Sequence, residues 1–168
     1  MRLLILVGCS VVLAASPGWA AEPTGDWMVE NGLGQVRIEN CSGSLWGVVS
    51  WEKVAGRDTE NPDPALRGRP MLGVPILLEM KPNRDRWEGH VYNAENGKTY
   101  TANIKLTAPN TLRIEGCILG GFFCGGQDWT RVVQPSAQSK GGAQKGAPKS
   151  TLVGDVCSRV SNLAGRPH

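Results

Sequence analysis

The stretch Arg86–Leu106, RWEGHVYNAENGKTYTANIKL, contains two alternating runs of apolar and polar residues separated by a short polar segment. A period of two places successive side chains on opposite faces of a β-strand. Between the runs, Asn96 and Gly97 form the Asn-Gly pair that is typical of a tight hairpin turn. The stretch therefore predicts an antiparallel hairpin with Trp87 and Tyr100 on its apolar face.

The same pattern continues on both sides of this hairpin. Between Gly25 and Val132, alternating runs are separated by turn-forming segments, and no run shows helical periodicity. This spacing predicts about eight short antiparallel strands connected in sequence order. A meander of that length either closes into a barrel or packs as a sandwich.

A pair of residues at the two ends of the meander favours the barrel. Gly25-Asp-Trp27 opens the first run, and Arg131 lies in the last. The pair resembles the lipocalin and fatty-acid-binding superfamily, in which an Arg near the last strand covers the Trp of a Gly-x-Trp in the first. Stacking of a guanidinium on an indole is stabilising, and it requires the first and last strands to be neighbours. We therefore predict an all-β, lipocalin-like barrel closed by Trp27 and Arg131.

Successive sequence blocks resemble a bacterial family, the domain of unknown function 2147. The blocks are GDWMVE, VRIENCSGSLWGVVSW, NPDPALRGRPMLG, RWEGHVYNAENGKTY, LRIEGC and QDWTRV, in the family's order. The resemblance covers roughly Gly25 to Val132 and implies an exported proteobacterial protein with a small lipocalin-like barrel. It implies no activity. The chain departs from the family at Trp46, where a second cysteine near Cys41 is often found.

The first twenty residues have the features of a signal peptide. Arg2 precedes an apolar run, and Gly18 and Ala20 supply the small residues of a cleavage site. A lipoprotein signal ending at Cys9 is a minor alternative, because its apolar region is too short. No later run reaches the ~20 apolar residues that a membrane span needs. We predict cleavage near Ala20 and a periplasmic or secreted protein.

Four cysteines remain after cleavage. An even number in an oxidising compartment predicts disulfides. Cys117 and Cys124 have the spacing of a clip across a hairpin, so we expect these two to pair. A Cys41–Cys157 disulfide then follows by elimination.

The composition predicts a barrel domain at 21–133, a flexible basic linker at 134–150 and a short helical tail at 151–168. The tail could dock on the barrel, on a partner, or on neither. Few large apolar residues follow Gln134, so the barrel is expected to fold without the tail.

The body carries twelve basic and fourteen acidic residues, whereas five basic residues and one acidic residue follow it. We interpret the basic segment as a solvated linker, and expect a monomer that does not bind nucleic acid.

The search for catalytic residues finds no motif. The chain has two histidines, and no His-Glu-x-x-His, Gly-x-Ser-x-Gly or phosphate-binding loop. Glu88 and His90 could share a metal or a proton, but alternation places both on the outer face of their strand with Tyr92. We favour that interpretation, and predict no enzymatic activity, no cofactor and no metal.

The segment Val54–Gly73 is long for a connection in this fold, and such loops are often functional. It carries four candidate ligand-binding residues, Asn61, Asp63, Arg67 and Arg69. The two arginines could hold a carboxylate or phosphate. Equally, they could pair with Asp58, Glu60 or Asp63 and hold the segment against the barrel mouth.

Two functions are consistent with these features. The first is a small binding barrel for an apolar or anionic ligand, with Trp51, Trp87 and Tyr100 inside the barrel as further candidate residues. The second is an envelope module with a solid barrel that binds a protein or polymer partner. The length of the body predicts at most a small pocket. A cavity beneath Arg67 and Arg69 would favour the first function.

Overall fold

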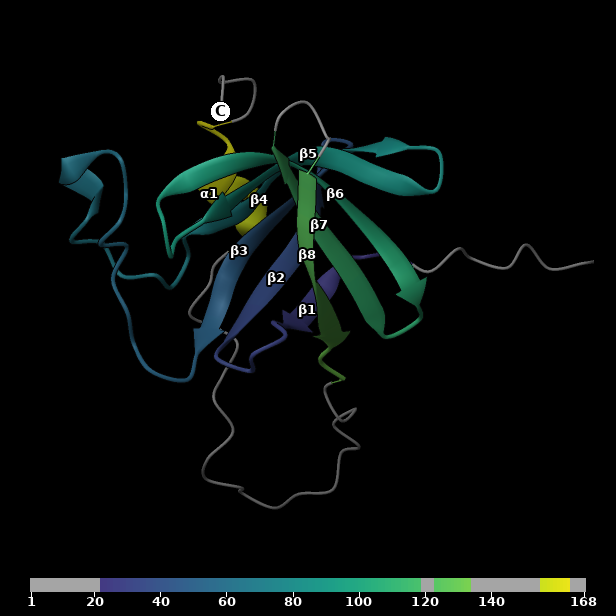
Figure 1. Cartoon of the computed structure of the whole chain (residues 1–168), viewed down its shortest axis with the longest axis horizontal. Helices are drawn as coiled ribbons and strands as arrows, with labels where there is room; N and C mark the ends of the chain where they lie inside the picture. Colours follow the sequence, from purple (N-terminus) through teal and green to yellow (C-terminus); the bar gives the residue numbers. More distant parts are fainter. Residues whose placement is uncertain (1–21, 119–122, 134–154, 164–168) are drawn as a thin grey trace, which may run out of the picture.

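The structure, a computed structural model, describes residues 22–118, 123–133 and 155–163. The predicted signal peptide and the linker 134–150 lie outside these ranges. The described residues form eight strands, a short 3-10 helix and a short α-helix (Figure 1). Their bounds are β1 Gly25–Met28, β2 Gly34–Cys41, β3 Ser44–Glu52, η1 Pro64–Leu66, β4 Pro75–Asn83, β5 Arg86–Asn93, β6 Lys98–Ala108, β7 Thr111–Ile118, β8 Phe123–Arg131 and α1 Val156–Val160.

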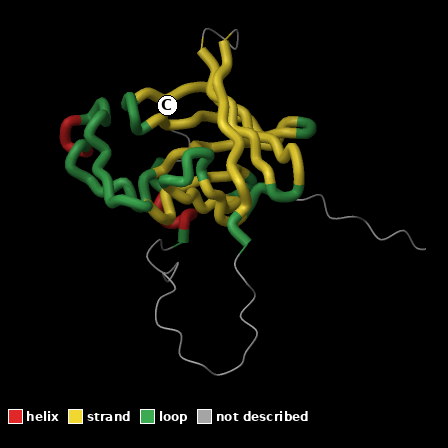
Figure 2. The backbone as a smooth tube through the Cα atoms, turned by 60° about the horizontal axis from the view of Figure 1, so that its bottom comes forward, coloured by secondary structure: helices red, strands yellow, loops and turns green. Residues whose placement is uncertain are grey.

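The strands form a closed barrel in sequence order. Each strand pairs antiparallel with the next, and β1 pairs with β8 through Trp27 opposite Arg131. Figure 2 shows the strands wrapping around one another, with the β3–β4 connection and η1 extending to one side. The predicted lipocalin-like barrel is thus confirmed over the sandwich alternative.

The Trp27–Arg131 contact lies at the seam where the barrel closes. The Arg131 guanidinium stacks over the Trp27 ring. It also donates hydrogen bonds to three backbone carbonyls, those of Thr24, Glu22 and Pro109. Trp27 is fully buried, and its indole Nε1 donates to the carbonyl of Pro23 at 2.8 Å. The seam therefore joins the N-terminal segment, β1 and β8.

Large side chains fill one half of the barrel interior. Trp27, Ile38, Leu45, Leu77, Met80, Ile104, Leu112 and Trp129 belong to this core, and Trp87 packs against it. The predicted hairpin is present, because Trp87 pairs with Ile104, and Gly97 adopts a positive φ of 69° in the turn. Glycine adopts that conformation at little cost.

Trp51 departs from the prediction that it lies in the barrel interior. Val36 pairs with Val49 but Gln35 pairs with Trp51, so β3 holds one extra residue in a β-bulge. A bulge changes the alternation of faces along a strand. Trp51 is accordingly partly exposed and packs against neither apolar cluster of the structure.

A second apolar cluster lies on the outside of the barrel, beneath α1. Val156 and Val160 of α1 are buried against Trp46, Val48 and Leu78. The Cys41–Cys157 disulfide joins α1 to the end of β2 with a Cα–Cα distance of 5.3 Å. Of the three predicted placements of the tail, the structure shows docking on the barrel for residues 155–163.

The second disulfide, between Cys117 and Cys124, joins β7 to β8. These two residues are direct partners in the sheet register. Both predicted cysteine pairs are therefore formed. Among the described residues, no helix has the length and apolar character needed to cross a membrane.

Candidate functional site

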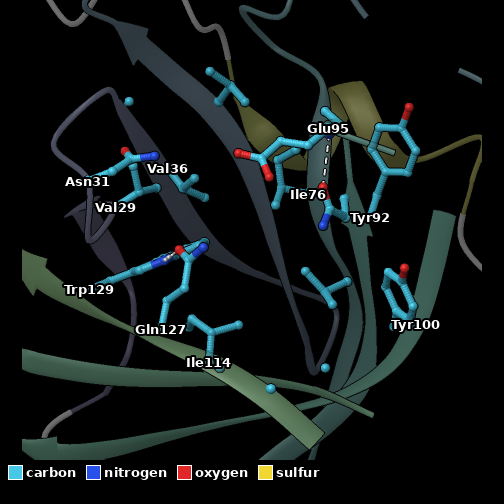
Figure 3. A pocket seen from close by; sticks show the side chains of 18 of the residues that line it. Val29, Asn31, Val36, Ile76, Tyr92, Glu95, Tyr100, Ile114, Gln127 and Trp129 are labelled. Atoms are coloured by element: carbon cyan, nitrogen blue, oxygen red, sulfur yellow. Dashed lines mark hydrogen bonds between the residues drawn. The ribbon is translucent and has the colours of Figure 1, made fainter. Parts of the chain in front are cut away.

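A cavity of about 880 Å³ occupies the half of the barrel that the core leaves unfilled (Figure 3). Its wall includes Asn31 from the β1–β2 connection, Glu95 from the β5–β6 turn, and Cys124 near the start of β8. Because the strands alternate in direction, these two connections and the start of β8 lie at the same end of the barrel. The cavity therefore opens at that end, and the core closes the other.

The wall of the cavity is mainly apolar. Its aliphatic side chains come from six strands or their ends: Val29, Val36, Val49, Ile76, Val91, Ile114 and Ile118. Gly116 and Gly125, which are paired across β7 and β8, also line it. A Cβ atom at Gly125 would meet no other atom within 4 Å. Small residues at these positions leave space, and the cavity exceeds the small pocket that the sequence predicts.

Several polar groups interrupt this apolar wall. The indole Nε1 of Trp129 donates to Gln127 Oε1 at 3.1 Å, and Asn96 Nδ2 donates to the Tyr100 hydroxyl at 3.0 Å. The backbone N–H of Glu95 donates to Asn93 Oδ1 at 2.8 Å (Figure 3). Among the described lining residues, Glu95 is the single carboxylate, and none is lysine, arginine or histidine.

The β3–β4 connection is held beside the mouth by a buried carboxylate. Asp58 is fully buried and accepts hydrogen bonds from three side chains. The Tyr92 hydroxyl donates at 2.5 Å, Asn61 Nδ2 at 2.7 Å, and Arg69 through Nε at 2.9 Å and Nη2 at 2.7 Å. Tyr92 is in β5 and lines the cavity edge. The cluster thus joins the connection to the barrel wall.

The surroundings of this cluster change two pKa values. Burial opposes the ionisation of Asp58, but hydrogen bonds from Tyr92, Asn61 and Arg69 outweigh it and keep the pKa of Asp58 below its usual value. Burial and the hydrogen bond to Asp58 raise the pKa of Tyr92 to about 12. Asp58 is accordingly ionised at neutral pH and Tyr92 is protonated.

The four predicted residues of this segment do not line the cavity. Asn61 and Arg69 contact Asp58, Arg67 Nε donates to the carbonyl of Asn61 at 2.8 Å, and the Asp63 carboxylate caps η1 through the N–H of Ala65. The Asp58–Arg69 ion pair is the interaction expected if the arginines hold the segment in place. The cavity opens beside this segment.

The other sequence candidates occupy different places. Tyr100 lines the cavity, whereas neither Trp51 nor Trp87 is among the lining residues. Glu88 accepts from Asn83 and Arg86, which lowers its pKa. His90 pairs in the sheet with Leu78, whose side chain belongs to the outer cluster.

One group of potential metal ligands is present among the described residues. Glu39, Asp155 and Cys157 bring ligand atoms within 4.8 Å of one another. The Cys157 sulfur is bonded to Cys41 and supplies no thiolate. The remaining two carboxylates make contacts that hold α1. Glu39 accepts from the N–H of Val156, and Asp155 accepts from the N–H of Cys157.

Sequence reasoning missed Gln127, Glu95, Asn31 and Asn93 as lining residues. Gln127 is two residues before Trp129, so alternation places a polar side chain on the inward face of β8. That polar residue at an inward position was a usable signal. The other three lie in or beside turns, where alternation assigns no face.

A family model described as "Uncharacterized protein conserved in bacteria (DUF2147)" matches residues 25–131. The chain belongs to this family. The match covers the DUF2147 barrel from the start of β1 to the end of β8. No curated protein matches the chain significantly.

A solved structure also resembles the DUF2147 barrel. It is described as protein HP1028 from the human pathogen Helicobacter pylori, belonging to the lipocalin family. The two chains share 22% identity, the similarity covers 68% of this chain and 85% of the other, and the TM-score is 0.61. At that identity the likeness establishes a lipocalin-like fold for this DUF2147 protein.

Proposed function

We propose that this DUF2147 protein is an exported binding protein that holds one small, largely apolar molecule inside its barrel. The observation that carries the proposal is the cavity of about 880 Å³, open at one end and lined mainly by aliphatic side chains. Its volume falls in the range of ~300–1,000 Å³ typical of small-molecule sites. Apolar walls with a few polar groups are also typical of such sites.

Binding is favoured over the two other functions considered. A solid barrel that serves only as an interaction module does not agree with a cavity of this size. For catalysis, an acid or base must reach the bound molecule. His90 and Glu88, the pair with catalytic potential in the sequence, are not among the lining residues. Glu95 is the single carboxylate among the described lining residues, and no histidine or lysine lines the cavity beside it.

The proposed location is the periplasm or the exterior of the cell. The support is the signal-peptide pattern of residues 1–20, together with two disulfides among the described residues. Disulfides persist in oxidising compartments and are rare in the cytosol. The proteobacterial origin implied by the sequence resemblance agrees with this location.

A neutral fluorescent probe tests the binding function. N-phenyl-1-naphthylamine fluoresces strongly in apolar surroundings, and we expect saturable enhancement with the folded protein. Gly125→Leu should weaken its binding by about tenfold or more, which is about 1.4 kcal/mol, because the new side chain enters the cavity. Native mass spectrometry of protein purified from periplasm should show a co-purified small molecule.

Gly68→Leu is the matched control. A Cβ at Gly68 also meets no atom within 4 Å, but Gly68 lies in the β3–β4 connection and does not line the cavity. We expect probe binding by this variant to equal that of the wild-type protein. If the probe fails to bind, or if both variants bind as the wild type does, the cavity is not a binding site.

A further inference from the structure

The charges around the cavity suggest which molecules it accepts. Anionic amphiphiles are held by basic side chains, and among the described lining residues there are none. A carboxylate that enters an apolar cavity without a cation loses its hydration without compensation. The cavity therefore discriminates against anions.

The Glu95 carboxylate favours a cation at the cavity. It lies in the β5–β6 turn, lines the cavity mouth, and is exposed to solvent. In Figure 3 its side chain extends over the cavity, above Ile76. Within the part of the chain that the structure describes, no salt bridge involves Glu95, and Lys98 in the following strand does not line the cavity. Its carboxylate is placed to meet the charged end of a molecule whose chain lies in the barrel.

The polar side chain that β8 contributes to the wall, Gln127, is uncharged. Because Trp129 Nε1 is a donor, its hydrogen bond requires the oxygen of Gln127 to face the indole. The Gln127 NH2 group then faces away from that oxygen and can donate to a bound molecule. This NH2 group suits an uncharged oxygen atom of the bound molecule, and it offers no ion-pair partner to a carboxylate.

We propose that the cavity selects a single-chain amphiphile with an ammonium head, in which the chain lies against the apolar wall and the head contacts Glu95. This inference rests on the proposed binding function and specifies its ligand class. A volume of about 880 Å³ suits one chain. The ammonium group remains at the mouth, partly hydrated, where it is attracted by the Glu95 carboxylate without the cost of full burial.

Three ligands of equal chain length test this preference. Decyltrimethylammonium, decanol and decanoate are titrated at neutral pH, below micelle formation, and displacement of N-phenyl-1-naphthylamine is measured. We expect decyltrimethylammonium to bind about tenfold or more tightly than decanoate, with decanol between them; tenfold corresponds to about 1.4 kcal/mol. Equal or tighter binding of decanoate would overturn the inference.

Two variants with the same change of charge locate the effect. Glu95→Gln should remove most of the preference for decyltrimethylammonium and leave decanol binding unchanged. Glu30→Gln is the control, because Glu30 is an exposed acid in the β1–β2 connection that does not line the cavity. An equal loss in both variants would indicate a general effect of net charge, and would refute the role of Glu95.

Failure of this inference differs from failure of the binding function. If decanol displaces the probe and the head group has no effect, the cavity binds apolar molecules but does not select a cation. If neither the probe nor any of the three ligands binds, the binding function fails, and the head-group preference fails with it.

Discussion

The guanidinium carbon of Arg131 lies 4.2 Å from the centroid of the Trp27 ring, at the position where β8 pairs with β1. The two residues are far apart in the sequence, and their contact requires the barrel to be closed. Burial lowers the pKa of Arg131, because its charge is removed from water. Three backbone carbonyls and the indole face compensate for this cost.

Arg131→Leu should therefore destabilise the protein. The variant keeps apolar bulk but loses the stacking interaction and the hydrogen bonds, so we expect a loss of about 1–3 kcal/mol in the free energy of unfolding. Urea denaturation measures this loss. Arg113→Leu is the control, since the ion pairs of Arg113 with Glu115 and Asp128, at 3.4 and 3.5 Å, are long and lie at the surface. Its effect should be much smaller, and equal effects would argue against a stabilising seam.

Gly97 provides a test of how the β3–β4 connection is held. Its φ is +69°, and a Cβ there would lie 1.8 Å from the carbonyl oxygen of Glu60. Gly97→Ala should displace the connection and increase tryptic cleavage at Arg57 and Arg67; the bond after Arg69 precedes Pro70 and resists trypsin. Gly32→Ala is a close control, because Gly32 has a φ of +68° and no atom within 4 Å of the Cβ position.

Both alanine variants carry the backbone strain of a left-handed conformation, about 1–2 kcal/mol. Only Gly97→Ala adds the collision with Glu60. The difference between the two in stability and in cleavage rate therefore reports on the contact itself. Identical behaviour of the two variants would show that the connection does not pack tightly against the β5–β6 turn.

The Asp58–Tyr92 pair predicts loss of stability at both extremes of pH. The pKa of Asp58 is lowered by folding, so unfolded chains take up the proton first, and its contribution is lost as pH falls below about 4. Folding raises the pKa of Tyr92 to about 12 from an ordinary value of 10.0, so unfolded chains lose that proton first. Its contribution is present below pH 10 and is lost as pH rises toward 12.

Tyr92→Phe should remove much of the alkaline decrease in melting temperature between pH 10 and 12. It also deprives buried Asp58 of a donor, so at neutral pH we expect a loss of about 1–3 kcal/mol. Tyr100→Phe serves as the control and should retain the alkaline decrease. If the pH profiles of the wild type and Tyr92→Phe are parallel above pH 10, Tyr92 is not responsible for that decrease.

The Cys41–Cys157 disulfide should contribute more stability than Cys117–Cys124. The first joins residues 116 apart in the sequence and the second residues 7 apart. Closing a longer loop removes more conformational freedom from the unfolded chain, typically with a gain of about 2–4 kcal/mol. Replacing each pair by serine and comparing urea midpoints tests this order. A larger loss from the Cys117–Cys124 replacement would contradict it.

Removal of residues 151–168 should lower the stability of the barrel more than the sequence suggests. Few large apolar residues follow Gln134, which predicts a barrel that folds without its tail. In the structure, Val156 and Val160 are 0% and 1% exposed, and their removal uncovers Trp46 and Val48. We expect a clear decrease in melting temperature and binding of an apolar dye to the uncovered patch. An unchanged melting temperature would show that the barrel is stable without its tail.

Much of the fold follows from local patterns in the sequence. Alternation and turn residues such as Asn96 and Gly97 act over a few neighbouring residues, so the hairpin and the order of the strands can be predicted without tertiary information. The Trp27–Arg131 contact could also be predicted, because a resemblance assigned both residues a joint role. The disulfides follow from the count and spacing of cysteines.

Tertiary structure decided the cavity, the position of the β3–β4 connection and the docking of α1. Alternation indicates that Gly116, Gly125 and Gln127 face inward, but the space between opposite walls depends on closure and register. A bulge in β3 redirected Trp51, and only the barrel wall brings Tyr92 to Asp58. Each of these features joins residues from distant strands, and their burial and charge interactions do not exist until those strands have assembled.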